Sequence, residues 1–137
     1  MITAHGRTEP GETTGLVIQN CTISGDAEYL PVKDINKSYL GRPWKAHARA
    51  IVMDSMIDDV IDKAGWATWP GQEFDKTCWF AEFGNRGPGA VTTERATWPG
   101  VKTVDAVQVD EFTAEKFIHG DHWIELSGIP FAKKTLV

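Results

Sequence analysis

The chain has 137 residues, of which 42% are hydrophobic and 24% charged, and its formal net charge is −5. These values are typical of one globular domain and exclude a disordered or collagen-like chain. A mildly acidic chain without a basic stripe is a poor binder of nucleic acid, and no apolar run approaches the roughly 20 residues of a membrane span. We therefore expect a soluble protein with neither nucleic acid nor a membrane as partner. Residues 1–7 lack the apolar core of a signal peptide.

Three short runs rich in β-branched and aromatic residues predict strands: Leu16–Ile23, Ala50–Ile57 and Thr77–Phe83. Shifting the first run by 34 residues lays it over the second and pairs Val17 with Ile51. Similar strands that recur at intervals of 27 to 34 residues indicate a repeat architecture, and none of the runs has a helical period. The pattern favours an all-β parallel solenoid, in which each coil stacks on its neighbour.

One short helix is expected near the C-terminus, over Thr113–Gly120. Thr113 is a candidate N-cap, Glu115 lies in the first turn, and Gly120 is a candidate stop. Such a helix could cover an open end or side of the solenoid.

The two cysteines, Cys21 and Cys78, are too few for a disulfide scaffold or a thiolate zinc site. We expect two buried free thiols, with a mutual disulfide as the alternative. His119 and His122 flank Asp121 on an expected loop, which is weak support for a metal, so no metal or other cofactor is predicted. Six tryptophans keep carbohydrate binding open, because flat aromatic faces stack on sugar rings.

The stretch Tyr39–Trp44 carries the most information. Gly41 permits a tight backbone, and Pro43 fixes its own φ and restricts Arg42 to an extended conformation. The result is a stiff loop that presents a guanidinium and an indole two residues apart. A fixed arginine is a good partner for a carboxylate, and a tryptophan nearby offers a surface for sugar stacking. The alternative is an ordinary ion pair beside a core tryptophan.

The Leu-Gly-Arg-Pro-Trp sequence within this stretch resembles the signature of plant-type pectinesterases (pectin methylesterases). Nearly the whole chain shares the resemblance, in order and with compatible spacing. The flanking segments that agree are residues 2–7, 15–23, 60–66, 87–90, 98–100, 117–123 and 128–131.

The resemblance implies a right-handed parallel β-helix and a carboxylic ester hydrolase. The family removes methyl groups from the galacturonate methyl esters of pectin and releases methanol. One Asp attacks the ester carbonyl, a second Asp is general acid and then base, and a Gln stabilises the oxyanion without any metal. The partner implied is pectin, and the location implied is extracellular, in the cell wall.

Only part of that machinery matches this chain. Arg42 resembles the family arginine that orients the nucleophilic Asp, and Trp44 resembles an aromatic residue that lines the pectin groove. Trp66, in the segment Ala64–Trp66, resembles another groove aromatic. Cys21 resembles a family cysteine whose disulfide partner lies upstream, which leaves Cys21 unpaired here.

The family motifs Gln-Asp-Thr-Leu and Asp-Phe-Ile-Phe-Gly, which hold the oxyanion Gln and both catalytic Asp residues, do not occur in the chain. Asp54, Asp58 and Asp59 lie where the family has no catalytic carboxylate, and we interpret them as solvated surface or turn residues. We therefore expect residues 1–137 to be the C-terminal part of a pectinesterase catalytic domain, inactive alone and able to self-associate through an exposed solenoid end. The alternatives are a non-catalytic pectin-binding module and a truncated product without function.

Overall fold

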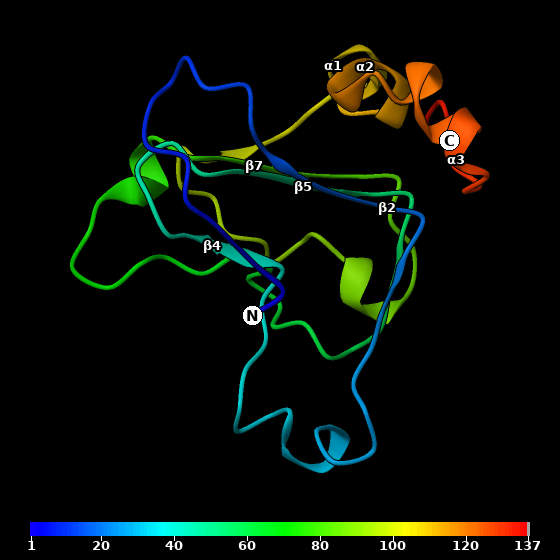
Figure 1. The fold of residues 1–137 in the computed structure, drawn as a ribbon. Coiled ribbons are helices and arrows are strands. Elements are labelled where there is room, and N and C mark those ends of the chain that lie inside the picture. Colours follow the sequence, from blue (N-terminus) through cyan, green and yellow to red (C-terminus); the bar gives the residue numbers. More distant parts are fainter. Residues whose placement is uncertain (137) are drawn as a thin grey trace.

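The computed structural model, which describes residues 1–136, contains three parallel sheets that the chain visits in turn (Figure 1). One passage through the three sheets is here called a coil. Sheet A contains β1 (Thr3–His5) and β4 (Gly41–Pro43); sheet B contains β2 (Leu16–Gln19), β5 (Arg49–Met53), β7 (Trp79–Phe83) and β8 (Val101–Lys102); sheet C contains β3 (Thr22–Ile23) and β6 (Met56–Ile57). Single bridges extend the outer sheets, from Gly41 to Trp66 in sheet A and from Met56 to Arg86 in sheet C. This repetition is that of a parallel solenoid.

The predicted register between the first two coils is confirmed. Val17 lies opposite Ile51 in the pairing of β2 with β5, and Ile23 lies opposite Ile57 in the pairing of β3 with β6. The third run supplies β7, which pairs with β5 in parallel and places Ala81 opposite Ile51. The shared offset across two sheets shows that the first two coils have the same length between these strands.

The runs over residues 16–23 and 50–57 are each divided into two strands, and the prediction of one continuous strand in each was wrong. Asn20 and Asp54 interrupt them in the left-handed conformation, with φ of 52° and 54°, and Gly84 takes φ of 60° after β7. Asn, Asp and Gly tolerate this region better than other residues. The Asn20 N–H donates to the Met53 carbonyl at 3.1 Å, and the Asp54 N–H donates to the Phe83 carbonyl at 2.9 Å. The three residues therefore form a stacked corner between sheets B and C.

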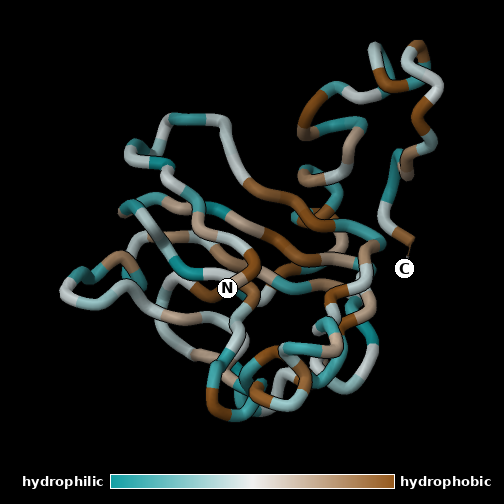
Figure 2. Tube along the Cα trace, turned by 60° about the horizontal axis from the view of Figure 1, so that its bottom comes forward, coloured by the Kyte–Doolittle hydropathy of each residue, from teal (hydrophilic) through white to brown (hydrophobic). Residues whose placement is uncertain are grey.

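Strand β5 is buried on both faces, which explains why it has an uninterrupted apolar sequence. Ala50 and Val52 point into the coils and belong to the larger core. Ile51 and Met53 point outward and pack beneath a second cluster that includes Val109. Figure 2 shows the hydrophobic segments running along these stacked strands and recurring in the C-terminal helices.

The C-terminal region contains three short α-helices, whereas one was expected. They are α1 (Ala106–Asp110), α2 (Ala114–Ile118) and α3 (Ile124–Ser127), with the 3₁₀ turn η4 (Gly120–His122) between α2 and α3. The other 3₁₀ turns lie between strands earlier in the chain: η1 (Leu30–Val32), η2 (Phe74–Lys76) and η3 (Pro88–Ala90). The expected helix corresponds to α2, whose C-cap is His119, with φ of 51°. Gly120, the predicted stop, is the first residue of η4. Thr113 precedes α2, but its hydroxyl donates to the Asp110 carbonyl at 2.8 Å and caps nothing. Asp105 caps α1 through a reciprocal capping box with Gln108, a pattern visible in the sequence.

The first strand of every sheet pairs on one side only within the described residues, since β1, β2 and β3 each have a single partner strand. Leu16 in β2 is 37% exposed. Unpaired strand edges of this kind are templates for further pairing.

The two cysteines differ in environment, so the expectation of two buried thiols was half wrong. Cys78 is buried in the core of the coils, whereas Cys21 is exposed beside the edge of sheet B, and neither forms a disulfide. Within residues 1–136, no helix has both the length and the apolar character needed to cross a membrane.

Thiol labelling tests this arrangement. Burial raises the pKa of the Cys78 thiol to about 12, so at about pH 8 it holds almost no thiolate, the form that reacts. We expect iodoacetamide to label one cysteine of the folded chain, Cys21, and the second only in denaturant. Cys21→Ser should abolish the rapid labelling, and equal labelling of both sites in the folded chain would contradict the core position of Cys78.

Acidification tests the contact between sheets A and B. His5 Nδ1 accepts a hydrogen bond from the Arg49 backbone N–H at 3.1 Å, and burial, then the charges of Arg49 and Arg7, lower the pKa of His5 below its ordinary 6.5. The unfolded chain thus binds the proton first, so the stability given by neutral His5 is complete above about pH 6.5 and is lost as the pH falls through the lower, folded-state pKa.

The free energy of unfolding in urea should therefore fall more steeply from about pH 8 to pH 5 in the natural chain than in His5→Asn, whose amide oxygen can accept the same bond at both pH values. His122→Asn is the control, because the side chain of His122 is 75% exposed. An identical pH dependence in the natural chain and His5→Asn would contradict the role of this contact.

Candidate functional site

Strand β4 places Arg42 and Trp44 on the same outward side of sheet A. Gly41 and Pro43 are buried, whereas Arg42 is half-buried and Trp44 is 52% exposed. This alternation is that of an extended chain, in which residues two apart share a face. Gly41 cannot be replaced without movement, because a Cβ there would lie 2.2 Å from Thr3 Oγ1 and 2.9 Å from the Trp66 ring.

The guanidinium of Arg42 stacks on an aromatic ring that was not predicted for the site. Its Cζ lies 4.4 Å from the centroid of the half-buried Trp69 ring. The Nε atom of Arg42 is buried and has no hydrogen-bond partner among residues 1–136. The sequence carried no local signal for Trp69, because its position under Arg42 depends on how the loop after Trp66 folds back on sheet A.

Trp44 offers an aromatic surface beside Arg42. Its ring packs over Gly6, where a Cβ would lie 3.0 Å from the ring carbon Cε3. The ammonium group of Lys45 lies 6.0 Å from the ring centroid. Exposed indole rings suit sugar stacking, and the adjacent cations suit a polymer that carries carboxylates.

Trp66 lies inside the coils and is only 2% exposed. Its ring stacks on Phe80 with centroids 4.5 Å apart and an interplanar angle of 20°, and its indole N–H donates to Glu82 Oε1 at 3.2 Å. In this structure the ring has no exposed face for a sugar. The half-buried ring next to Arg42 is instead that of Trp69.

A family model of pectinesterases matches residues 1–121 of the chain. The chain belongs to the pectinesterase family. Probable pectinesterase/pectinesterase inhibitor 58 of Arabidopsis thaliana is 49% identical over 131 residues, and a pectinesterase/pectinesterase inhibitor of Ficus pumila var. awkeotsang is 46% identical over 131 residues. These alignments cover 96% and 95% of this chain but 23% and 24% of the relatives, so the chain spans about a quarter of their length.

Solved structures carry the same parallel-sheet fold. Pectin methylesterase from carrot superposes with a TM-score of 0.93 at 40% identity, over 97% of this chain and 42% of the carrot chain. Pectin methylesterase from Aspergillus niger superposes with a TM-score of 0.71 at 27% identity, over 90% of this chain and 37% of the fungal one.

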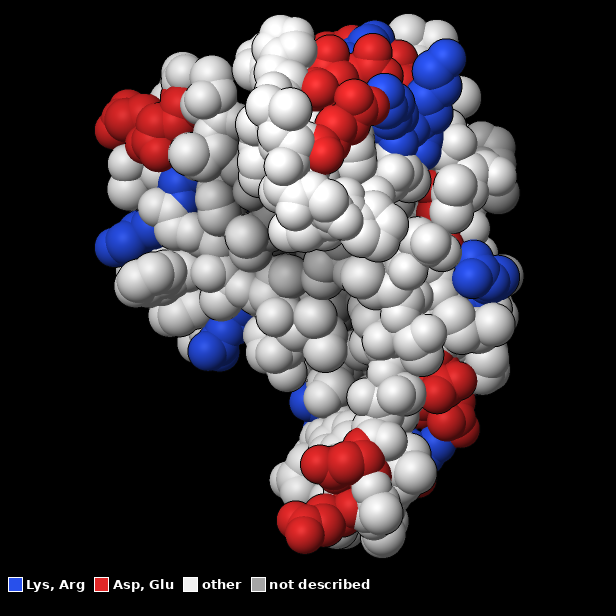
Figure 3. All heavy atoms as spheres, turned by 45° about the vertical axis from the view of Figure 1, so that its right-hand side comes forward, with Lys and Arg blue, Asp and Glu red and all other residues white. Residues whose placement is uncertain are grey.

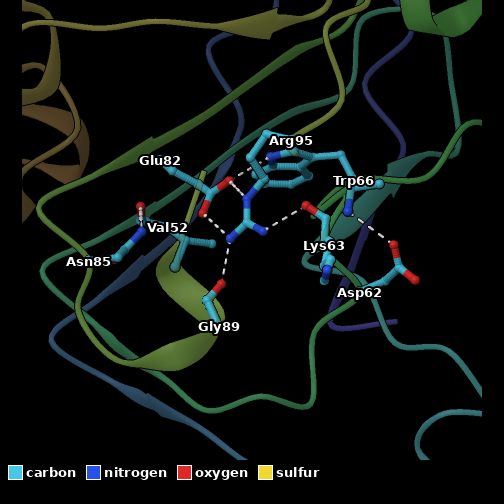
Figure 4. A network of polar contacts seen from close by, with 9 residues as sticks. Val52, Asp62, Lys63, Trp66, Glu82, Asn85, Gly89 and Arg95 are labelled. Carbon is cyan, nitrogen blue, oxygen red and sulfur yellow. Dashed lines mark hydrogen bonds and ion pairs between the residues drawn. The ribbon is translucent and has the colours of Figure 1, made fainter. Parts of the chain in front are cut away.

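Beneath the site of this pectinesterase-family chain lies a buried ion pair (Figure 4). Arg95 donates to both carboxylate oxygens of Glu82, at 2.8 Å and 3.0 Å, and their side chains are 8% and 10% exposed. Arg95 also donates to the carbonyls of Lys63 at 3.0 Å and Gly89 at 2.6 Å. Because Glu82 accepts from the Trp66 indole, the pair fixes the ring that packs against Gly41.

Asp54, Asp58 and Asp59, which we interpreted as solvated surface or turn residues, differ from one another in burial. Asp54 does form a turn, but it is fully buried, and the interpretation as solvated was wrong for it. Its Oδ2 accepts from the Gln19 amide at 3.1 Å and from the Leu136 backbone N–H at 3.0 Å, while its Oδ1 has no partner among residues 1–136. Asp59 is exposed and paired with Lys33, and Asp58 is half-buried.

Within the described part of the chain, no group of three or more His, Cys, Asp or Glu residues is placed to hold a metal ion. His119 and His122 stack with ring centroids 6.2 Å apart. Arg42 forms no ion pair with any carboxylate of residues 1–136. Arg42, Trp44 and Trp69 thus give this part of sheet A a guanidinium and two indole rings, and none of the three supplies a nucleophile.

Removal of either partner of the buried pair tests its role beneath the site. Glu82→Ala leaves the Arg95 guanidinium buried without its carboxylate, which should lower the free energy of unfolding by about 3–5 kcal/mol. Lys63→Ala is the matched control, because the Lys63–Glu94 pair is 77% and 62% exposed; its urea midpoint should barely move. Equal midpoints for both variants would contradict a structural role for the buried pair.

Proposed function

We propose that this chain forms the C-terminal part, residues 1–137, of the catalytic domain of an extracellular, cell-wall pectinesterase. The reaction is hydrolysis of galacturonate methyl esters in pectin, which yields pectate and methanol. The observation that carries the proposal is the family match over residues 1–121, together with Arg42 and Trp44 on one outward face of sheet A. We also propose that the coils form a right-handed β-helix.

Arg42 has the geometry of a positioning residue for a carboxylate nucleophile. Its backbone is held between Gly41 and Pro43, its guanidinium stacks on Trp69, and it forms no salt bridge within residues 1–136, where its buried Nε also has no hydrogen-bond partner. A guanidinium can hold a carboxylate through two parallel hydrogen bonds and so orient it for attack. In the reaction that the resemblance implies, the Asp held in this way attacks the ester carbonyl, methanol leaves with a proton from the second Asp, and water then hydrolyses the acyl intermediate.

Trp44 and Trp66 have different parts in this proposal. Trp44, which is 52% exposed, contacts the sugar rings directly, and the exposed side of Trp69 extends the same surface. Trp66 acts from the interior, because it is 2% exposed and packs against Gly41 under the arginine. Pectin is accordingly the partner of sheet A, while the unpaired edges of β1, β2 and β3 are the surface through which the isolated chain would self-associate.

A non-catalytic pectin-binding module is the second candidate. It is favoured by the exposed Trp44 beside Arg42, an arginine that forms no ion pair with a carboxylate within residues 1–136. Both candidates require binding of pectin, and only the first requires ester hydrolysis by a longer protein.

Methanol release from methyl-esterified pectin tests activity. The chain of 137 residues should release no more methanol than a blank, because neither catalytic Asp motif occurs in it. A longer protein that carries this chain after those motifs should be active, and Arg42→Ala in it should lower kcat by about 100-fold or more. Methanol release by the chain alone that Arg42→Ala abolishes would contradict the proposed inactivity.

A further inference from the structure

The loop between β3 and β4 carries a triplet, Asn36-Lys37-Ser38, that the function of sheet A does not use. Asparagine followed by any residue except proline and then by serine or threonine is the acceptor sequence for N-linked oligosaccharides in secreted proteins. A second triplet of this type, Asn20-Cys21-Thr22, lies at the corner between β2 and β3. The surroundings of the two asparagines distinguish these triplets.

Asn36 has a fixed backbone and a free side chain. Its N–H donates to the Val32 carbonyl at 2.8 Å, and its carbonyl accepts from the Tyr29 hydroxyl at 2.7 Å. The side chain is exposed, and its amide forms no hydrogen bond within residues 1–136. The fold therefore does not depend on the amide nitrogen, and a sugar attached to it would displace no hydrogen bond.

The loop around Asn36 has room for a bulky substituent. Between β3 and β4 the chain projects away from the three sheets (Figure 1), and this loop forms a lobe at the lower end of the molecule in the space-filling view (Figure 3). An ion pair between Lys37 and Asp62, at 3.2 Å, ties the loop to the next coil. Beside it lies a polar hollow of about 540 Å³, whose lining includes Lys37 and Ser38. An oligosaccharide on Asn36 would meet solvent and polar groups and would cover no apolar core.

Asn20 occupies a structural position instead. It takes φ of 52° at the corner between sheets B and C, where Asp54 and Gly84 follow it in the next two coils. Asp54, which lies between the other two corner residues, is fully buried. In the longer protein of the proposed function, a preceding coil packs against Asn20 in the same way, and a closely packed corner has no space for a sugar.

We propose that Asn36 is a site of N-glycosylation. The donor is a lipid-linked oligosaccharide diphosphate, and the transfer is catalysed by an enzyme of the secretory pathway. The Asn36 amide nitrogen forms a bond to C1 of the reducing-end N-acetylglucosamine and loses one proton to a base of that enzyme, while the bond from C1 to the diphosphate oxygen breaks and the lipid diphosphate leaves. Asn36 meets this donor only during export, so the inference rests on the extracellular location in the proposed function; it goes beyond that function by assigning a modification outside sheet A.

Expression of the full chain of 137 residues in cultured plant cells tests the assignment. A cleavable secretion signal placed before residue 1 supplies the route to the donor, and its removal, read from the mass, proves entry. Because the transfer accompanies synthesis, both secreted and cell-retained chains are analysed. We expect peptide N-glycosidase F to remove the mass of one oligosaccharide. That enzyme converts the carrier asparagine to aspartate, and peptide mass spectrometry should place the conversion at Asn36.

Variants assign the oligosaccharide to the triplet. Asn36→Gln should abolish the modification and leave thermal unfolding of the deglycosylated chain unchanged, because this amide forms no hydrogen bond within residues 1–136. Ser38→Ala keeps the asparagine and should also abolish the modification, whereas Ser38→Thr keeps an acceptor sequence and should retain it. Asn20→Gln is the matched control in the second triplet and should leave the oligosaccharide in place.

Each outcome bears on one proposal. An oligosaccharide that Asn36→Gln and Ser38→Ala both remove supports the inference. A chain that has lost its secretion signal and carries no oligosaccharide, or carries one only on Asn20, overturns the inference and leaves the proposed function standing. Modification of both asparagines supports the inference for Asn36 and contradicts the packing argued for Asn20. The proposed function fails separately, if the longer protein releases no methanol from methyl-esterified pectin.

Discussion

The in-register parallel pairing of β2, β5 and β7 sets the position of every other part of this molecule. Strand β5 is buried on both faces. Its side chains fill the interior of the coils on one side, and on the other side they form the surface against which the C-terminal helices pack. The left-handed residues Asn20 and Asp54 turn the chain at the same point in successive coils. A slip of one residue would exchange the side chains of the two differently shaped cores and would break the stack of Asn20, Asp54 and Gly84 at the corner.

The site on sheet A depends on that core through a short series of contacts. The carboxylate of Glu82 projects from β7 to Arg95 and to the indole of Trp66. The Trp66 ring then packs against Gly41, the residue before Arg42. Buried ion pairs stabilise little by themselves, but they fix geometry when every oxygen and N–H has a partner. The rigidity of the surface arginine therefore originates in groups that no ligand touches.

Much of the fold and of the candidate site could be predicted from the sequence, wherever the residues that determine a feature lie close together in the chain. The offset of 34 residues gave the register, and the Gly41–Trp44 stretch gave the rigid arginine with an outward tryptophan. The choice between Trp66 and Trp69 could not be made, because it depends on which ring meets Phe80 across the coil. The buried carboxylate of Asp54 is contacted by Gln19 and by Leu136, 35 and 82 residues away, and long-range contacts of this kind leave no periodic pattern.

Two buried side-chain atoms have no hydrogen-bond partner among residues 1–136, Arg42 Nε and Asp54 Oδ1, and both lie in the second coil. An unsatisfied buried group of this kind typically costs about 1–3 kcal/mol of stability, so each is a strained element of the chain on its own. For Asp54 the other oxygen has two donors, which makes the carboxylate part of the corner. Arg42 Nε has no partner among residues 1–136, and the contact that holds its guanidinium is the stacking on Trp69, with Cζ 4.4 Å from the ring centroid. A group held by stacking keeps its plane without using its N–H donors, so the position of Arg42 depends on the packing of Trp69 and Gly41 rather than on a hydrogen bond of its own.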